Sequence, residues 1–305
     1  MKILNIPECV GLNDTFSARS QYSVHSWLID VAPKISCSSN ISYVNASFTL
    51  RHKLRYNCYY SLVKYAQQQP KHIFLATSFH ISYFIPRFHP HKSPANVVWF
   101  VMEPTYPHVP QVVIPYVATK KDIVDMSPVP WNKRKLIILA GHVPKLKFST
   151  VRAKVAQTLK NVANATVLVG KNRLSEKDYK KSVLKHKFCV VAAGDTRSTK
   201  KVAEMMVIGA NGGCIPLLIN GVTKPYTQNL YTQSTFEVSR LDSSTISFIH
   251  TINETKYAAM VAELQRVEKF FSQPTASQEL LSRLCNFLFK YNLYRTSEHI
   301  IPFFF

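Results

Sequence analysis

Apolar runs and helical patterns alternate along the second half of this chain. Short apolar stretches typical of buried parallel strands stop at glycine or polar positions, and the segments between them repeat their apolar residues with helical spacing. The predicted strands are 136–140, 165–169, 188–192 and 215–219, and the predicted helices are 150–161, 176–186, 199–208, 244–267 with a break, and 275–291. This alternation predicts a parallel sheet with helices on both faces.

The first half of the chain gives fewer signals. Residues 71–79 and 97–102 predict buried strands and residues 54–67 predict a helix, whereas the polar residues before them fit no clear pattern. A Pro-containing polar stretch at 125–134 is the best candidate for a linker. We therefore expect an α/β protein with a short N-terminal domain, residues 1–130, and a C-terminal domain, residues 131–305.

The segment from 179 to 219 carries the strongest chemical signal. A Gly-Asp-Thr turn at 194–196 follows a predicted strand, and the next helix begins with Lys200 and Lys201 after a cap at Ser198 or Thr199. A helix N-terminus attracts phosphate, and lysines in a first helical turn are unfavourable unless an anion meets them. The pattern predicts an anion site; the alternative is an ordinary αβ unit with solvated lysines.

Composition and charge narrow the partners. The 305 residues are 46% hydrophobic and 12% aromatic, which excludes a disordered chain, and the net charge is +21. Such a charge implies an anionic partner, which is a nucleotide, an acidic polysaccharide, a membrane surface or nucleic acid. Only the nucleotide is supported by a local motif, since no nucleic-acid-binding module is visible. For most of the lysines, solubility charge is the better interpretation.

Several rare sequence elements occur here in the order typical of exostosin-like glycosyltransferases. The chain resembles that family through Lys187-Phe188-Cys189, Gly194-Asp195-Thr196, Ser198-Thr199-Lys200-Lys201 and Gly213-Cys214-Ile215-Pro216. Residues 113–116, 135–141 and 151–152 and Tyr179 are also similar to family segments, and the resemblance covers residues 111–240. Two features depart from the family: lysines replace the usual arginines, which loses the bidentate fork, and extra residues lie around 208–211.

The resemblance implies a fold and a reaction. It implies two Rossmann-like domains that face each other across a cleft, the GT-B arrangement. It also implies an inverting, metal-independent transfer of a sugar from a UDP-sugar to a glycan acceptor, with no cofactor besides the donor. The high positive charge makes an acidic acceptor attractive. Association with a related transferase, as a hetero- or homo-oligomer, is a further expectation.

The donor site implied by the resemblance lies at the carboxyl ends of the strands. Gly141 is expected to let the backbone approach the ligand, and Arg152 to clamp the diphosphate unless it is a surface arginine. Only one of the two adjacent lysines is expected to point inward, and Lys200 is favoured to offset charge on the leaving UDP. Glu204 is expected to bind the ribose, or else to be an exposed helix glutamate. Thr196, Ser198 and Thr199, with the neighbouring N–H groups, are expected to hold the phosphate oxygens. Gly194 and Asp195 are assigned to the same nucleotide-sugar site.

The catalytic base and the metal content are less well defined by the sequence. Glu103 follows the predicted strand 97–102 and is the candidate for the base that deprotonates the acceptor. No Asp-x-Asp pair is present to hold a divalent cation, so no metal is expected. Four nearby histidines lack a carboxylate or thiolate partner and are expected to be surface residues rather than zinc ligands: His80, His89, His91 and His108.

Cysteines and glycosylation sequons bear on the cellular compartment. Cys189 and Cys214 lie at the heads of two strands expected to be neighbours, and are either a disulfide or two buried thiols. The chain has five sequons where composition predicts roughly two, which indicates secretory exposure. The candidate acceptors are Asn13, Asn40, Asn45 and Asn253, whereas Asn164, beside a predicted strand, is the least expected to be modified.

The resemblance to exostosin-like glycosyltransferases implies a membrane protein of the Golgi, and the sequence conflicts with this expectation in one respect. No signal peptide is visible, and no apolar run approaches the length of about twenty residues that spans a bilayer. A truncated chain, an isolated luminal portion or anchoring by a partner would explain the difference.

Three functions remain open at this point. The first is the UDP-sugar-dependent glycosyltransferase. The second is a catalytically silent relative that binds donor or glycan and partners an active enzyme. The third, and most remote, is a basic nucleic-acid-binding protein. An acidic or histidine side chain that faces Lys200 across the cleft would favour the active glycosyltransferase over the silent relative.

Overall fold

The chain forms two compact units in a computed structural model. The residues described are 1–9, 28, 31–36, 40–47, 55–78, 94–101, 110–113, 116, 118–119, 127, 129–141, 149–169, 174–193, 199–222, 224, 230–273 and 275–292. The first unit comprises Met1–Pro115 together with Pro274–Phe305, and the second comprises Tyr116–Gln273. Each unit is built around its own parallel sheet.

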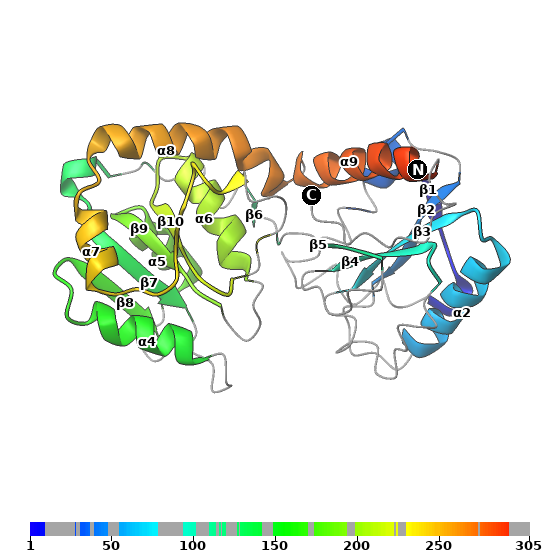
Figure 1. Cartoon of the computed structure of the whole chain (residues 1–305), viewed down its shortest axis with the longest axis horizontal. Helices are drawn as coiled ribbons and strands as arrows, with labels where there is room; N and C mark the ends of the chain where they lie inside the picture. The colour runs from blue at the N-terminus through cyan, green and yellow to red at the C-terminus, as the bar shows by residue number, and fades with distance from the viewer. Residues whose placement is uncertain are drawn as a thin grey trace. The chain divides into compact units, whose positions relative to one another are not determined.

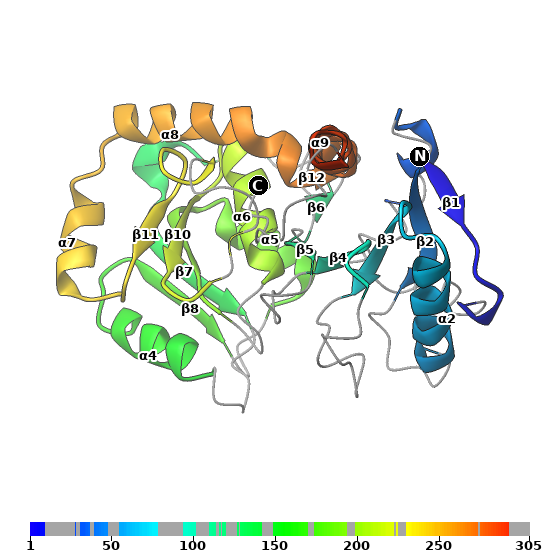
Figure 2. The same ribbon diagram turned by 45° about the vertical axis from the view of Figure 1, so that its right-hand side comes forward.

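The sheet of the first unit has five parallel strands in the order in which they occur along the chain. The strands are β1 (Lys2–Leu4), β2 (Ile41–Ser47), β3 (Ile73–Ser78), β4 (Val97–Val101) and β5 (Gln111–Val113). The helix α2 (Arg55–Gln68) connects β2 to β3, and the C-terminal helix α9 (Thr275–Asn292) runs along the sheet (Figures 1 and 2). Short 3₁₀ turns, η1 (Pro7–Cys9) and η2 (Ala32–Lys34), complete the described part of this unit.

The core of the first unit lies where β4 meets α2. All five residues of β4 are buried, and the Trp99 ring lies 6.2 Å from the ring of Tyr59 on α2. A disulfide between Cys9 and Cys58 ties η1 to the same helix. Buried apolar residues on both faces of a strand are typical of a parallel sheet that is covered on both sides.

The sheet of the second unit is also parallel, but its strand order is not sequential. The order is β8 (Ala165–Val169), β7 (Lys135–Gly141), β9 (His186–Val191), β10 (Ile215–Ile219) and β11 (Phe236–Val238). Counted within the unit, this is the doubly wound order 2-1-3-4-5, in which the direction of winding reverses between β7 and β9. That reversal determines where a ligand can bind.

Helices cover both faces of this second sheet, as the alternating pattern predicted. Figure 1 shows α4 on one face and α6 and α8 on the other. The helices are α4 (Ser149–Leu159), α5 (Glu176–Val183), α6 (Lys200–Ala210), α7 (Ser243–His250) and α8 (Glu254–Val267). The remaining elements are the 3₁₀ turns η5 (Trp131–Lys133) and η8 (Glu268–Phe270), and a two-stranded ribbon of β6 (Ala118–Thr119) and β12 (Ser272–Gln273).

The α/β class and the parallel sheets agree with the sequence prediction, whereas the division of the chain differs from it. The predicted boundary fell between residues 130 and 131, but the compact units meet between 115 and 116. The segment from Pro274 onward was predicted to belong to the second domain and groups with the first unit instead. The ribbon between β6 and β12 explains part of the difference, because it anchors residues 118–119 in the second unit.

Candidate functional site

The point at which the strand order reverses lies between the carboxyl ends of β7 and β9. In open α/β sheets, ligands bind outside the carboxyl ends of the strands at such a point, because the connections leave on opposite faces and open a crevice. Gly141 is the last residue of β7, and Ala192 and Ala193 follow β9. The described residues nearest to this position come from α4, α5 and α6.

Arg152, in the first turns of α4, bridges these two strand ends. Its guanidinium donates to the carbonyl oxygen of Ala192 from Nε at 3.2 Å and from Nη2 at 3.0 Å. The same group lies beside Gly141, because a Cβ placed on that glycine would be 3.7 Å from Nη1 of Arg152. Gly141 has a φ of +157°, which residues with a side chain rarely adopt. The structure therefore brings the two predicted residues together at the expected edge of the sheet.

The helix α6 begins next to this position with a side-chain cap. Thr199 is the N-cap, and its Oγ1 accepts a hydrogen bond of 3.3 Å from the backbone N–H of Lys201. This is one of the two caps that the sequence predicted. Threonine in the extended conformation at this position satisfies one of the free donors of the first helical turn. The first two residues of the helix are Lys200 and Lys201.

Both lysines contact one carboxylate. Lys201 Nζ lies 2.6 Å from Oε2 of Glu204, and Lys200 Nζ lies 3.2 Å from Oε1. The three side chains are largely buried, with exposed fractions of 25% for Lys201, 15% for Lys200 and 18% for Glu204. The expected division into one inward and one outward lysine is therefore not seen, and Glu204 is not an exposed helix glutamate.

The environment shifts the pKa values of this cluster. Burial lowers the pKa of Lys201, although Glu204 opposes the shift. For Glu204, burial acts to raise the pKa, but the positive charges of Lys201 and Lys200 outweigh it and the pKa lies below its ordinary value. The guanidinium of Arg152 also acts on the Lys201 ammonium, which places the three cations within electrostatic reach of one another.

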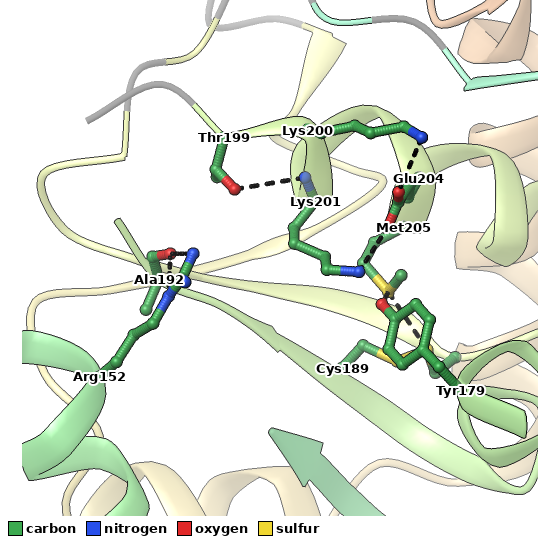
Figure 3. A network of polar contacts seen from close by, with 10 residues as sticks. Arg152, Tyr179, Cys189, Ala192, Thr199, Lys200, Lys201, Glu204 and Met205 are labelled. Carbon is green, nitrogen blue, oxygen red and sulfur yellow. Dashed lines mark hydrogen bonds and ion pairs between the residues drawn. A yellow bond between two sulfur atoms is a disulfide. The ribbon is translucent and has the colours of Figure 1, made fainter. Parts of the chain in front are cut away.

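Lys201 rests on an aromatic ring from the neighbouring helix. Figure 3 shows the ammonium of Lys201 beside Tyr179 of α5, and Nζ lies 3.6 Å from the ring centroid. The Tyr179 hydroxyl is 4.0 Å from Sδ of Met205, which in turn is 3.8 Å from Sγ of Cys214. Burial, followed by the charge of Glu204, raises the pKa of Tyr179 well above its ordinary value, so the hydroxyl stays protonated.

A disulfide joins β9 to the residue before β10. Cys189 and Cys214 are bonded to each other, so of the two alternatives left open by the sequence the structure shows the bridge. Both residues are buried. The register of the two strands places Cys189 opposite Pro216, which brings Cys214 within reach. A second disulfide, between Cys9 and Cys58, was not predicted, because nothing in the spacing of these residues marks them as partners.

The bend before β10 is held by Arg134. Its Nη2 donates to the carbonyl of Gly212 at 2.8 Å, and its Nη1 donates to the carbonyl of Gly213 at 3.2 Å and to Tyr257 Oη at 2.6 Å. The Tyr257 hydroxyl donates to the same two carbonyls. Arg134 and Tyr257 were not predicted, since their partners are distant in sequence and no local pattern relates them.

The other predicted site residues fall partly outside the described part of the chain. Gly194, Asp195, Thr196, Ser198, Glu103 and Asn13 lie outside the described residues, as do His80, His89, His91 and His108. Among the candidate glycosylation sites, Asn45 donates from Nδ2 to Asn5 at 2.6 Å, and Asn253 caps α8 by accepting from the Lys256 N–H at 2.9 Å. Asn40 and Asn164 are exposed.

A separate cavity lies on the other side of α4. It has a volume of about 530 Å³, and α4 faces the ends of β10 and β11 across it. Its walls include Val151, Val155, Ile219, Asn220, Ser239 and Leu241. The cavity is open to solvent and shares α4 with the Arg152 site.

Among the described residues, no group of three or more histidine, cysteine or acidic side chains could hold a metal ion. No helix in the same part of the chain is long and apolar enough to cross a membrane.

Comparison with known proteins does not identify a family. No protein-family model matches the chain, and no curated protein shows significant sequence similarity to it.

Proposed function

We propose that this protein is a glycosyltransferase that uses a UDP-sugar donor and binds the diphosphate without a metal ion. The observation that carries the proposal is the cluster of Arg152, Lys200 and Lys201 beside the N-terminus of α6, at the point where the strand order reverses. Such a site combines a helix dipole with cationic side chains, which together suit a diphosphate.

The cluster also suits the chemistry of the transfer. When the bond between the sugar and UDP breaks, negative charge builds up on the diphosphate, and fixed cations in a largely buried site stabilise it. Arg152 would reach the diphosphate from the β7 side, and the two lysines would reach it from α6. Glu204 holds both lysines in this structure, and we propose that it also meets the ribose hydroxyls when the donor binds.

The remaining parts of the proposal depend on the resemblance to exostosin-like glycosyltransferases. They are the GT-B cleft, an inverting reaction with Glu103 as base, a glycan acceptor on the first unit and a Golgi location. The Cys9–Cys58 and Cys189–Cys214 disulfides support a secretory compartment, since disulfides form and persist in oxidising environments.

Calorimetric titration of UDP into the purified chain, with EDTA present, tests the proposal. The wild-type chain is expected to bind UDP, and the Lys200→Ala/Lys201→Ala variant to lose at least tenfold in affinity, as expected for two charge-assisted contacts of about 1.5–3 kcal/mol each. The matched control is Lys133→Ala/Lys135→Ala, which removes the same charge from exposed positions at the amino end of β7.

The outcomes separate the remaining functions. Binding that only the Lys200→Ala/Lys201→Ala variant loses supports a metal-independent donor site and justifies a screen of UDP-sugars for turnover. Binding of UDP without turnover of any sugar would favour the silent relative. Absence of UDP binding by the folded wild-type chain, or an equal loss in both variants, would contradict the proposal.

A further inference from the structure

The ammonium of Lys201, at the N-terminus of α6, is in contact with both an aromatic ring and a carboxylate. Its ammonium lies over the ring of Tyr179 on a different helix, while its partner on α6, Glu204, holds it from the side (Figure 3). Lysine has a long flexible stem and is fixed in space only when several contacts restrain it. The ring and the carboxylate together restrain Nζ in two directions.

The hydroxyl of Tyr179 also makes a contact, on the side away from the backbone. It contacts Met205 Sδ, and Met205 contacts Cys214 of the disulfide to Cys189. These contacts form a continuous path from the buried disulfide between β9 and β10 to the ammonium of Lys201. Because Cys189 lies on β9, the path connects Lys201 to the sheet of the second unit.

We propose that Tyr179 is a positioning residue that sets the place of the Lys201 ammonium for anion binding. This role rests on the proposed function, because it assigns Tyr179 to the same donor site. Tyr179 acts through Lys201 and does not itself meet the diphosphate. Its ring provides the attraction for the ammonium, and its hydroxyl makes only the long contact with sulfur.

The contact between the Tyr179 ring and Lys201 should affect how anion binding depends on pH. The charged and titratable groups that face Lys201 are Glu204 and Lys200 on α6, Tyr179 on α5 and Arg152 on α4. Burial is the main cause that lowers the pKa of Lys201. Anion affinity should therefore fall at alkaline pH as Lys201 loses its proton. Loss of the Tyr179 ring would remove an attraction that favours the charged ammonium while an apolar side chain keeps the site buried, so the pKa of Lys201 should fall further and this alkaline limb should move to lower pH.

Titration of UDP as a function of pH tests the role. Tyr179→Phe keeps the ring and is expected to bind within about twofold of wild type, whereas Tyr179→Leu is expected to weaken binding by about 3- to 30-fold, the range of a lost cation–π contact. The alkaline limb should move to lower pH in Tyr179→Leu and stay in place in Tyr179→Phe. Tyr179→Met removes the ring but fills the space, so it serves as the second test if the leucine variant does not fold.

Tyr231→Leu is the matched control. Tyr231 is a fully buried tyrosine of the same unit with a lysine, Lys224, 5.9 Å from its ring centroid, and its ring packs against Phe271. Its variant should lose stability while keeping wild-type UDP affinity. Unchanged affinity and an unmoved alkaline limb in both Tyr179→Leu and Tyr179→Met would overturn the positioning role alone. A wild-type chain that binds no UDP would overturn this role and the proposed function together.

Discussion

Glu204 determines how the positive charges at the start of α6 are held. Its two carboxylate oxygens accept one lysine each, from residues three and four positions earlier on the helix. Side chains at these spacings lie on the same helical face, so the pairs could be foreseen from the sequence. Because the lysines keep the pKa of Glu204 below its ordinary value, this side chain is charged in the folded protein at neutral pH.

Glu204→Gln is expected to destabilise the second unit by about 1–3 kcal/mol at neutral pH, because two largely buried lysines lose a charged acceptor. A carboxyl whose pKa is lower in the folded chain than in the unfolded chain stabilises the fold above its unfolded pKa. That contribution is lost as the pH falls through the folded pKa. Wild type should therefore lose more stability than the variant on acidification. Urea unfolding at neutral and acidic pH measures the difference.

Glu263→Gln is the matched control for this measurement. Glu263 pairs with Arg266 on the exposed face of α8, at 2.8 Å, with 61% of the arginine side chain exposed. Exposed pairs of this kind contribute about 0–1 kcal/mol. An equal loss of stability in the two variants, or an equal acid sensitivity of Glu204→Gln and wild type, would show that the buried cluster contributes no more than a surface pair.

At the level of elements, a close approach of two helices supports the candidate site. A Cβ placed on Gly209 of α6 would lie 2.6 Å from Cδ1 of Leu264 on α8 and 3.1 Å from the carbonyl oxygen of Cys214. Leu264 is fully buried. Glycine at this position therefore allows α6 to pack against α8, which keeps the N-terminus of α6 at the sheet edge.

Gly209→Ala is expected to destabilise the protein by about 1–3 kcal/mol, the usual cost of overpacking a core. The sign of this stability change is informative, because replacing glycine by alanine in a helix interior otherwise stabilises a protein by about 1 kcal/mol. A double-mutant cycle with Leu264→Ala, measured by urea unfolding, isolates the clash: the Gly209→Ala substitution should cost less when the leucine has been shortened. Stabilisation by Gly209→Ala alone would mean that α8 moves away without cost.

The sequence predicted the elements of the second unit well, for a physical reason. Its strands β7 to β10 are continuous apolar runs between polar breaks, so all four were placed within about two residues, the usual uncertainty of element ends. The strands β1, β5 and β11 were missed because each has only three residues, and β2 was missed because serine and asparagine interrupt its apolar positions.

The candidate site could be predicted in part. The capped start of α6 followed from the local pattern, whereas the family resemblance implied Arg152 and Gly141, which the structure brings close together. The contact between Tyr179 and Lys201 was not foreseen, since these residues belong to different helices whose packing the pattern does not fix. The same holds for Arg134, whose acceptors at Gly212 and Gly213 are distant in sequence.

On the scale of the whole molecule, the two units differ in the number of chain segments that form them. The first unit is assembled from both ends of the chain, whereas the second is continuous. A return of the C-terminal segment to the first unit leaves no signal in local hydrophobic pattern, because it is determined by contacts between distant residues. This explains why the compact units differ from the two domains that were predicted on either side of residue 130.

Each unit contains a disulfide between described residues, and we expect the effects of removing these two disulfides to be independent of each other. Cys9–Cys58 and Cys189–Cys214 are separated by 49 and 25 residues. Loop-closure entropy then gives a stabilisation of about 4 kcal/mol for the first disulfide and slightly less for the second. Cys9→Ala/Cys58→Ala should weaken hydrogen-exchange protection in β3 and β4, and Cys189→Ala/Cys214→Ala should weaken it in β9 and β10.

Hydrogen exchange read separately for the two sheets distinguishes local from global effects. If each variant loses protection only in its own unit, the two units are independent folding units that each require an oxidising environment, as expected of a secretory protein. Equal loss over both sheets in either variant would show that the units unfold together. In that case the Cys9–Cys58 disulfide would stabilise the candidate site as strongly as Cys189–Cys214 does, although it lies in the other unit.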